Sequence, residues 1–115
     1  MKVILRKVLI ADANSPYDGK VKDILIQNGF IHKIADEINE SADNIFEKEN
    51  TIISNGWIDC FSNFCDPGFE YRETLETGAA SAVAGGFTEV FVLPNTNPVV
   101  HSKSQVEYIA QKSKS

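Results

Sequence analysis

The stretch ETLETGAASAVAGGFTEVFVL, residues 73–93, decides the fold class. Its first part, residues 73–84, predicts a helix, because apolar side chains recur at helical spacing along one face, namely at Leu75, Ala79, Ala82 and Val83. Gly85-Gly86 then stops the helix, since a glycine adopts the left-handed conformation without a Cβ clash. Residues 87–93 are almost continuously apolar, which is typical of a parallel strand buried on both faces. This order indicates an α/β protein.

The flanking sequence extends the same alternation. Residues 57–61 form a short apolar run that predicts a buried strand before the helix. Ser102 and Gln105 form a capping-box pattern that opens a second helix reaching about residue 112, with an apolar face of Val106, Ile109 and Ala110. Strand, helix, strand and helix in this order indicate βαβ units of a parallel sheet. The loops 62–72 and 94–101 follow the carboxyl ends of the two strands, where α/β proteins place their chemistry.

The first half of the chain reads as short strands and turns. Strands are predicted over residues 2–10, 21–27, 30–35, around 45–46, and 51–53. Asn28-Gly29 is a strong signal for a type I′ hairpin turn, whose central residues need a positive φ. The stretch 36–50 is rich in acidic residues and is interpreted as a solvated loop. We therefore expect a small β domain over residues 1–54 and an α/β part over residues 55–115.

Composition and charge exclude several classes of protein. The chain has 115 residues, of which 43% are hydrophobic, so it is not a disordered tail. Its formal net charge of −5 argues against binding to nucleic acid, whose phosphates need a basic surface. No apolar run of about 18 residues is present, so no membrane span is predicted, and the expected compartment is the cytoplasm.

The two cysteines, Cys60 and Cys65, are interpreted as reduced thiols. A secreted disulfide scaffold of this size normally carries more cysteines. A structural zinc site would need four ligands at tighter spacing, and the two histidines, His32 and His101, lie far away in the sequence.

Several blocks of sequence, in the same order and spacing, resemble the N-terminal part of the cyclic amidohydrolases, and most closely the dihydroorotases. The blocks are GWID at residues 56–59, DPGFEYRE at 66–73, ETG at 76–78, AGGFT at 84–88, LPNTNP at 93–98 and DILIQNGFI at 23–31. The resemblance covers nearly the whole chain.

The resemblance implies a fold and a reaction. The family's fold is a metal-dependent (β/α)8 barrel with a small β-sandwich built from both ends of the chain. This chain would supply the N-terminal part of the sandwich and the first two β/α units of the barrel, which is incomplete at the C-terminus since such a barrel needs roughly 250 residues. The implied reaction is the reversible cyclisation of carbamoyl aspartate to dihydroorotate in pyrimidine biosynthesis, with zinc in the active members supplying a bound hydroxide.

The chain departs from the family where the first barrel strand of active members ends in D-x-H-x-H-x-R. The two histidine positions hold Phe61 and Asn63, and the position of the substrate-binding arginine holds Cys65. Phenylalanine has no lone pair for a metal, and asparagine is a poor zinc ligand. We therefore expect no metal ligand and no catalytic residue in this chain, as in the inactive dihydroorotase-like members. Cys60 or Cys65 as a replacement thiolate ligand is the alternative, while Phe61 and Phe64 are expected to fill the barrel mouth.

One substrate-binding residue is carried over by the resemblance. Asn95 matches the asparagine that hydrogen-bonds the substrate carboxylate, and its alternative role is an Asx turn that orders the loop. Asp59 is interpreted as an acceptor that anchors its loop. The acidic residues Glu70, Glu73 and Glu76 are expected at the start of the helix, where its dipole favours negative charge, and His101 is expected to face solvent.

Three functions follow from these patterns. The first is a dihydroorotase-like protein with a decayed metal site, either as a homo-oligomer or as a non-catalytic partner of aspartate carbamoyltransferase. The second is an active cyclic amidohydrolase that holds one metal through ligands beyond residue 115. The third is a stand-alone binding module of about this length.

Overall fold

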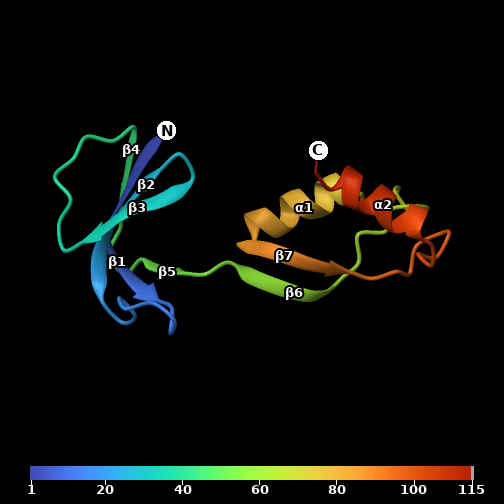
Figure 1. The fold of residues 1–115 in the computed structure, drawn as a ribbon, viewed down its shortest axis with the longest axis horizontal. Helices are drawn as coiled ribbons and strands as arrows, with labels where there is room; N and C mark the ends of the chain where they lie inside the picture. The colour runs from blue at the N-terminus through green and yellow to red at the C-terminus, as the bar shows by residue number, and fades with distance from the viewer. Residues whose placement is uncertain (115) are drawn as a thin grey trace. The chain divides into compact units, whose positions relative to one another are not determined.

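A computed structural model describes residues 1–114, and these residues form two compact units, 1–55 and 56–114. The first unit is a β-sheet, and the second alternates strands with helices (Figure 1). None of the helices in the described part of the chain is long and apolar enough to cross a membrane.

The first unit is a five-stranded sheet. Its strands are β1 (Lys2–Ala11), β2 (Val21–Gln27), β3 (Phe30–Ala35), β4 (Asn44–Glu47) and β5 (Ile52–Ser54). Their order is β3-β2-β1-β4, with β5 also pairing β1. The antiparallel hairpin of β2 and β3 turns at Asn28 and Gly29, whose φ angles of 52° and 84° confirm the predicted turn.

Two small groups of aliphatic side chains form the core of this unit. Ile4 and Leu25 pack with Ile38, and Val8 and Ile10 pack with Ile24. Ile38 is fully buried although it lies in the stretch 36–50, so the prediction that this stretch is a solvated loop is wrong at that point. The apolar side chain of Ile38 is the reason, because it covers the sheet while its acidic neighbours stay in water.

A bulge in β1 is held by a buried carboxylate. The pairing of β1 with β2 shifts between Leu5 and Val8, and Lys7 there has a positive φ of 49°. Asp23 of β2 is 2% exposed, and it accepts hydrogen bonds from the Lys7 N–H at 2.9 Å, the Ile38 N–H at 3.1 Å and the Arg6 guanidinium at 2.6 Å. Burial raises the pKa of Asp23, but these hydrogen bonds outweigh it and hold the pKa below its usual value.

The second unit is a β/α/β/α segment. Its elements are β6 (Trp57–Ser62), α1 (Leu75–Ala84), β7 (Phe87–Val92) and α2 (Lys103–Lys112). Strands β6 and β7 pair in parallel, as the βαβ pattern predicts. Helix α1 begins after the N-cap residue Thr74, and Gly86 at its end has a φ of +83°, which confirms the predicted stop. The capping box of Ser102 and Gln105 is also confirmed.

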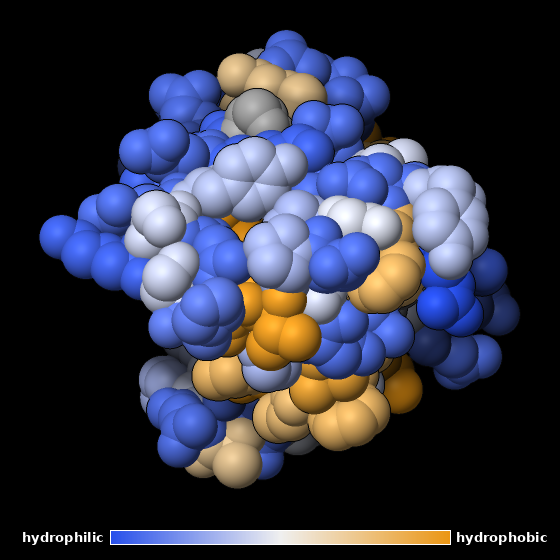
Figure 2. Space-filling model, turned by 90° about the vertical axis from the view of Figure 1, so that its right-hand side faces the viewer, coloured by the Kyte–Doolittle hydropathy of each residue, from blue (hydrophilic) through white to orange (hydrophobic). Residues whose placement is uncertain are grey.

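The predicted burial of this unit is wrong in the described chain. Ile58 and Phe61 of β6 are 53% and 75% exposed, and Phe91 of β7 is 61% exposed. The reason is that the two-stranded sheet is covered by helix α1 on one face only, so the other face stays open. Figure 2 shows hydrophobic residues among hydrophilic ones on the surface seen from the right-hand side of Figure 1.

The buried faces of the helices also differ from the prediction. In α1 the buried residues are Leu75 and Gly78, whereas Val83 is 72% exposed. Helix α2 has no buried residue, and Val106 on its predicted apolar face is 55% exposed. The predicted helices are therefore present, but the buried side of α1 includes Gly78, which lies against the ring of Phe64 in the loop after β6.

Candidate functional site

The candidate site consists of the two loops at the carboxyl ends of β6 and β7. The parallel pairing brings these loops together, and the Asn97 N–H donates to the Pro67 carbonyl at 3.0 Å. The Leu93 N–H donates to the Ser62 carbonyl at 2.8 Å where the strands end. The loops 62–72 and 94–101 that the sequence singles out thus lie side by side at one edge of the sheet.

The three positions that differ from the family pattern lie at the end of β6 and in the loop that follows it. Phe61 is exposed and has no donor atom, and Asn63 is exposed as well. Cys65 is 7% exposed, and its Sγ lies 3.4 Å from Asn63 Oδ1 and 3.7 Å from the Asn63 carbonyl oxygen. The Asn63 amide oxygen is therefore occupied by a thiol, and of the three side chains only that of Cys65 is a ligand type that zinc favours.

A bulge in β6 moves these side chains away from strict alternation. Asp59 pairs with Val90 and Ser62 with Val92, so three steps along β6 match two steps along β7. The extra residue interrupts the alternation along β6, and Asn63 lies beyond the end of this strand.

Asp59 stabilises this bulge. One carboxylate oxygen accepts from the Phe61 N–H at 2.9 Å, and the other accepts from the Ser62 hydroxyl at 2.8 Å. These two hydrogen bonds lower the pKa of Asp59, so it is ionised at neutral pH. The interpretation of Asp59 as an anchor of its loop is confirmed.

Both cysteines are free thiols, as the sequence predicts. Cys60 is exposed on β6, whereas the Cys65 thiol points toward Asn63. Within residues 1–114, no group of three or more His, Cys, Asp or Glu side chains is arranged to hold a metal ion. A thiolate ligand at either cysteine would therefore lack neighbouring ligands from the described chain.

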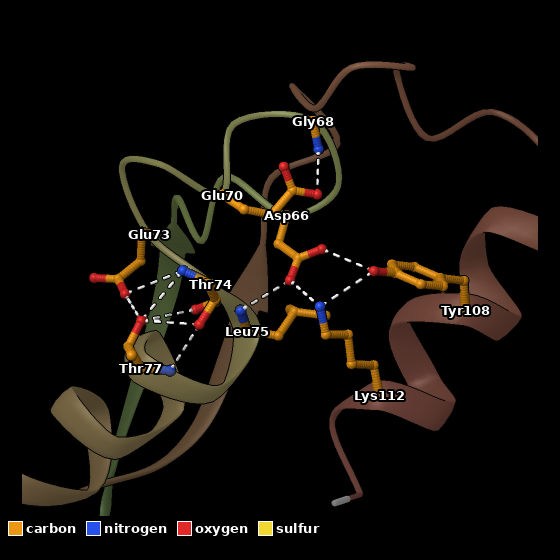
Figure 3. Close-up of polar contacts among 9 residues, drawn as sticks. All are labelled: Asp66, Gly68, Glu70, Glu73, Thr74, Leu75, Thr77, Tyr108 and Lys112. Atoms are coloured by element: carbon orange, nitrogen blue, oxygen red, sulfur yellow. Dashed lines mark hydrogen bonds and ion pairs between the residues drawn. The ribbon is translucent and has the colours of Figure 1, made fainter.

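Asp66 is the polar centre of the second unit (Figure 3). Its carboxylate is fully buried and accepts from the Leu75 N–H at 3.3 Å, the Tyr108 hydroxyl at 3.1 Å and the Lys112 ammonium at 2.7 Å. It thereby ties the loop after β6 to the first turn of α1 and to the last turns of α2. Burial raises the pKa of Asp66, but the hydrogen bonds, led by that from Lys112, lower it overall. The bond to Asp66 raises the pKa of Lys112.

Sequence reasoning missed this cluster. Tyr108 and Lys112 are four residues apart, so they lie on one face of α2, and that spacing was the available signal. Nothing in the sequence relates them to Asp66, which lies more than 40 residues earlier and belongs to a turn motif.

Two of the acidic residues near α1, Glu70 and Glu73, accept hydrogen bonds from neighbouring residues. Glu73 lies before the N-cap and accepts from the Thr74 N–H and from the Thr77 hydroxyl (Figure 3). Glu70 lies in the loop, where it accepts from the Gly68 N–H at 2.8 Å. Only Glu76 is in the first turn of α1, so the placement of all three at the helix start is correct for Glu76 alone. The loop geometry that draws Glu70 to Gly68 explains the difference.

The loop after β7 exposes Asn95 and buries its neighbour. Thr96 is 3% exposed, and its hydroxyl donates to the Pro98 carbonyl at 2.8 Å, so Thr96 orders this loop from within. Asn95 is exposed at the surface of the loop. His101 is exposed just before α2, as expected, with its Nδ1 2.7 Å from the Val99 carbonyl oxygen.

Replacement of Gly78 by alanine is expected to destabilise the second unit by about 1–2 kcal/mol, although alanine is the better helix former. A Cβ at position 78 would lie 2.8 Å from the ring of Phe64, which packs against α1 there. In a Phe64→Ala background the same substitution should stabilise the chain by about 0.5–1 kcal/mol, because only the helix propensity remains. Urea unfolding of the four variants measures this change of sign, and equal effects in both backgrounds would refute the contact.

Stability is expected to fall when the pH drops below about 4. The folded pKa values of Asp23 and Asp66 lie below their usual value. Their contribution is therefore complete above the pKa of the unfolded chain and is lost as the pH falls through the folded pKa values. Urea midpoints between pH 2 and 7 test this, with Asp23→Asn/Asp66→Asn expected to give a shallower profile. A higher midpoint at pH 3 than at pH 6 would contradict it.

A family model described as "Dihydro-orotase-like" matches residues 50–115. The chain is 35% identical over 114 residues to a protein named dihydroorotase from Ruminiclostridium cellulolyticum, covering 99% of this chain and 26% of that protein. A dihydroorotase of Aquifex aeolicus is 39% identical over 115 residues, covering 100% of this chain and 27% of that protein. The chain thus spans about a quarter of the length of these curated relatives.

Solved structures show a similar fold. An L-hydantoinase (dihydropyrimidinase) from Arthrobacter aurescens superposes with a TM-score of 0.80 at 18% identity, covering 96% of this chain and 24% of that one. A D-hydantoinase superposes with a TM-score of 0.60 at 24% identity, covering 97% of this chain and 24% of that one. The predicted α/β architecture after a β domain therefore agrees with the fold of the matching part of these proteins.

Proposed function

Because this chain belongs to the dihydro-orotase-like family, we propose that it comes from a dihydroorotase-like protein of pyrimidine biosynthesis that does not interconvert carbamoyl aspartate and dihydroorotate. One observation carries the proposal. The loop after β6 holds Phe61, Asn63 and Cys65 where the family pattern has two metal-binding histidines and a substrate-binding arginine.

The local geometry supports a loss of metal binding beyond the change of residue types. The carboxylate of Asp59 is used by the Phe61 N–H and the Ser62 hydroxyl. The Asn63 amide oxygen contacts the Cys65 thiol. A hydrated zinc ion would have to displace these internal hydrogen bonds, and in return it would gain one amide, at most one thiolate and no imidazole.

The replacement of the family's arginine by Cys65 also weakens the binding of a substrate carboxylate. A carboxylate is best held by a guanidinium that donates two parallel hydrogen bonds, and Cys65 cannot supply them. Asn95 is exposed and retains the amide that the resemblance assigns to the substrate carboxylate. A single neutral amide contributes roughly 0.5–1.5 kcal/mol, which is too little for binding by itself.

We also propose that the protein is a non-catalytic structural partner of aspartate carbamoyltransferase. It is supported by the exposed apolar side chains of the second unit, including Phe61, Phe91 and Val83. Co-elution of the two proteins on a gel-filtration column tests this role, and separate elution at micromolar concentrations of both would remove it.

The catalytic part of the proposal is tested by following the hydrolysis of dihydroorotate in buffer with added zinc. The dihydroorotase of Aquifex aeolicus serves as the positive control. We expect the rate with this chain to equal that of buffer alone. A rate that rises in proportion to the concentration of the chain, and that a zinc chelator abolishes, would overturn the proposal.

A further inference from the structure

Two Asn-Gly dipeptides occur in the chain, Asn28-Gly29 and Asn55-Gly56. In such a dipeptide the backbone nitrogen of the glycine can attack the amide carbon of the asparagine side chain, because the glycine has no Cβ that hinders the approach. The attack closes a five-membered succinimide ring, so the backbone must let this nitrogen come next to the side chain. The reactivity of the two sites therefore depends on how the fold holds each asparagine.

The turn between β2 and β3 holds Asn28 in an unreactive conformation. Its φ of 52° lies in the left-handed region, and Gly29 follows with a φ of 84°. In that region the nitrogen of the next residue is anti to Cβ, on the far side of Cα from the side-chain amide. The pairing of Gln27 with Phe30 holds the turn on both sides. The Asn28 N–H also donates to the Met1 carbonyl at 3.0 Å, so ring closure would require this turn to open.

Asn55 is not restrained in this way. It lies in the connection between β5 and β6, outside both strands, and its φ is not in the left-handed region. Asn55 and Gly56 are both exposed. Among residues 1–114, no hydrogen bond holds the Asn55 side-chain amide or the Gly56 N–H. The amide carbon and the attacking nitrogen can therefore approach each other.

Packing against Thr88 requires the glycine at position 56. A Cβ there would lie 2.1 Å from Thr88 Cγ2 and 2.5 Å from the Thr88 hydroxyl oxygen. Such distances are well inside van der Waals contact, so only glycine allows this close approach. A larger residue, which would slow ring closure, is thus excluded at the position that follows Asn55.

We propose that Asn55 is a site of spontaneous deamidation. The Gly56 nitrogen gives its proton to hydroxide and bonds to Cγ of Asn55, while the bond from Cγ to the side-chain nitrogen breaks and ammonia leaves. Water then opens the succinimide at either carbonyl, which gives aspartate or isoaspartate and adds one negative charge. Isoaspartate also adds a methylene to the backbone two residues before Trp57, whose N–H donates to the Gly86 carbonyl at 2.9 Å. The reaction does not depend on the proposed loss of catalysis.

The test incubates the 115-residue chain at pH 8 and 37 °C and follows deamidation by mass spectrometry of tryptic peptides. Asn28 lies in the peptide of residues 23–33 and Asn55 in that of residues 49–72, so one digest reports on both sites. We expect Asn55 to react at least tenfold faster than Asn28 in buffer, and the two rates to agree within threefold in 8 M urea. Equal rates in buffer, or an unmodified Asn55 after four weeks, would overturn the proposal. A tenfold difference that persists in urea would contradict protection of Asn28 by its turn.

Two asparagine variants locate the reaction within the longer peptide. Asn55→Gln should abolish deamidation of the peptide 49–72, because glutamine closes a six-membered ring much more slowly. Asn50→Gln is the matched control, since Asn50 lies in the same peptide and precedes a threonine, and it should change the rate less than twofold. Loss of the signal in Asn50→Gln, with Asn55→Gln unchanged, would place the modification at Asn50 and contradict the proposal.

Discussion

Asp23→Ala is expected to destabilise the first unit by about 3–4 kcal/mol. The substitution removes the acceptor of the Lys7 and Ile38 N–H groups and leaves the guanidinium of Arg6, which is 20% exposed, without its carboxylate. Lys7 holds its positive φ within the bulge that this carboxylate fixes. The core of this unit consists of two clusters of three buried residues each. Its free energy of unfolding is therefore small, and a loss of this size is a large fraction of it.

Hydrogen exchange followed by mass spectrometry measures this effect, because peptides from residues 1–55 and 56–114 report on the two units separately. We expect faster exchange in the first range only. Glu47→Ala is the matched control, since Glu47 is 56% exposed and its ion pair is with Lys7, which is 75% exposed. A change below about 0.5 kcal/mol is expected for the control. Equal exchange in Asp23→Ala and the wild type would show that the bulge does not depend on Asp23.

Asp66→Ala is expected to destabilise the second unit by about 2–3 kcal/mol. The Leu75 N–H is buried and loses its partner, whereas Tyr108 and Lys112 reach solvent and can be hydrated. The expected cost is therefore smaller than at Asp23. Helix α2 has no buried residue, so it should lose protection from exchange before α1 does.

The control for Asp66 is Glu107→Gln, which removes the exposed ion pair with Lys103 on the same helix. Exposed pairs at this spacing contribute about 0.3–0.5 kcal/mol, so exchange in α2 should be nearly unchanged. If Asp66→Ala and Glu107→Gln altered the exchange of α2 to the same extent, the buried carboxylate would have no special role in holding the helix.

Local signals in the sequence determine the elements well. The Asn28-Gly29 turn and the capping box at Ser102 place a hairpin and a helix start without any knowledge of tertiary contacts. The rest depends on residues that are distant in sequence. The roles of Asp23 and Asp66 come from partners on other elements, and the buried face of α1 comes from the contact between Gly78 and Phe64.

The candidate site likewise has features that the sequence predicts and features that it does not. The types of residue at positions 61, 63 and 65 are read directly from the sequence, and they exclude imidazole ligands there. The bulge between Asp59 and Ser62 is not visible in the sequence, because an alternating pattern assumes a regular strand. Phe61 is 75% exposed among the described residues, which supply two strands of a barrel, so its packing at the barrel mouth stays a prediction.

The most direct test of the account is the zinc content of the 115-residue chain after dialysis against micromolar zinc and removal of unbound metal. The account predicts less than about 0.1 equivalent for the wild type, because the loop after β6 offers no imidazole. Phe61→His/Asn63→His, which restores both histidines, should retain clearly more zinc and serves as the positive control. Close to one equivalent of zinc in the wild type, lost on Cys65→Ser, would contradict the account and establish a thiolate site in this loop.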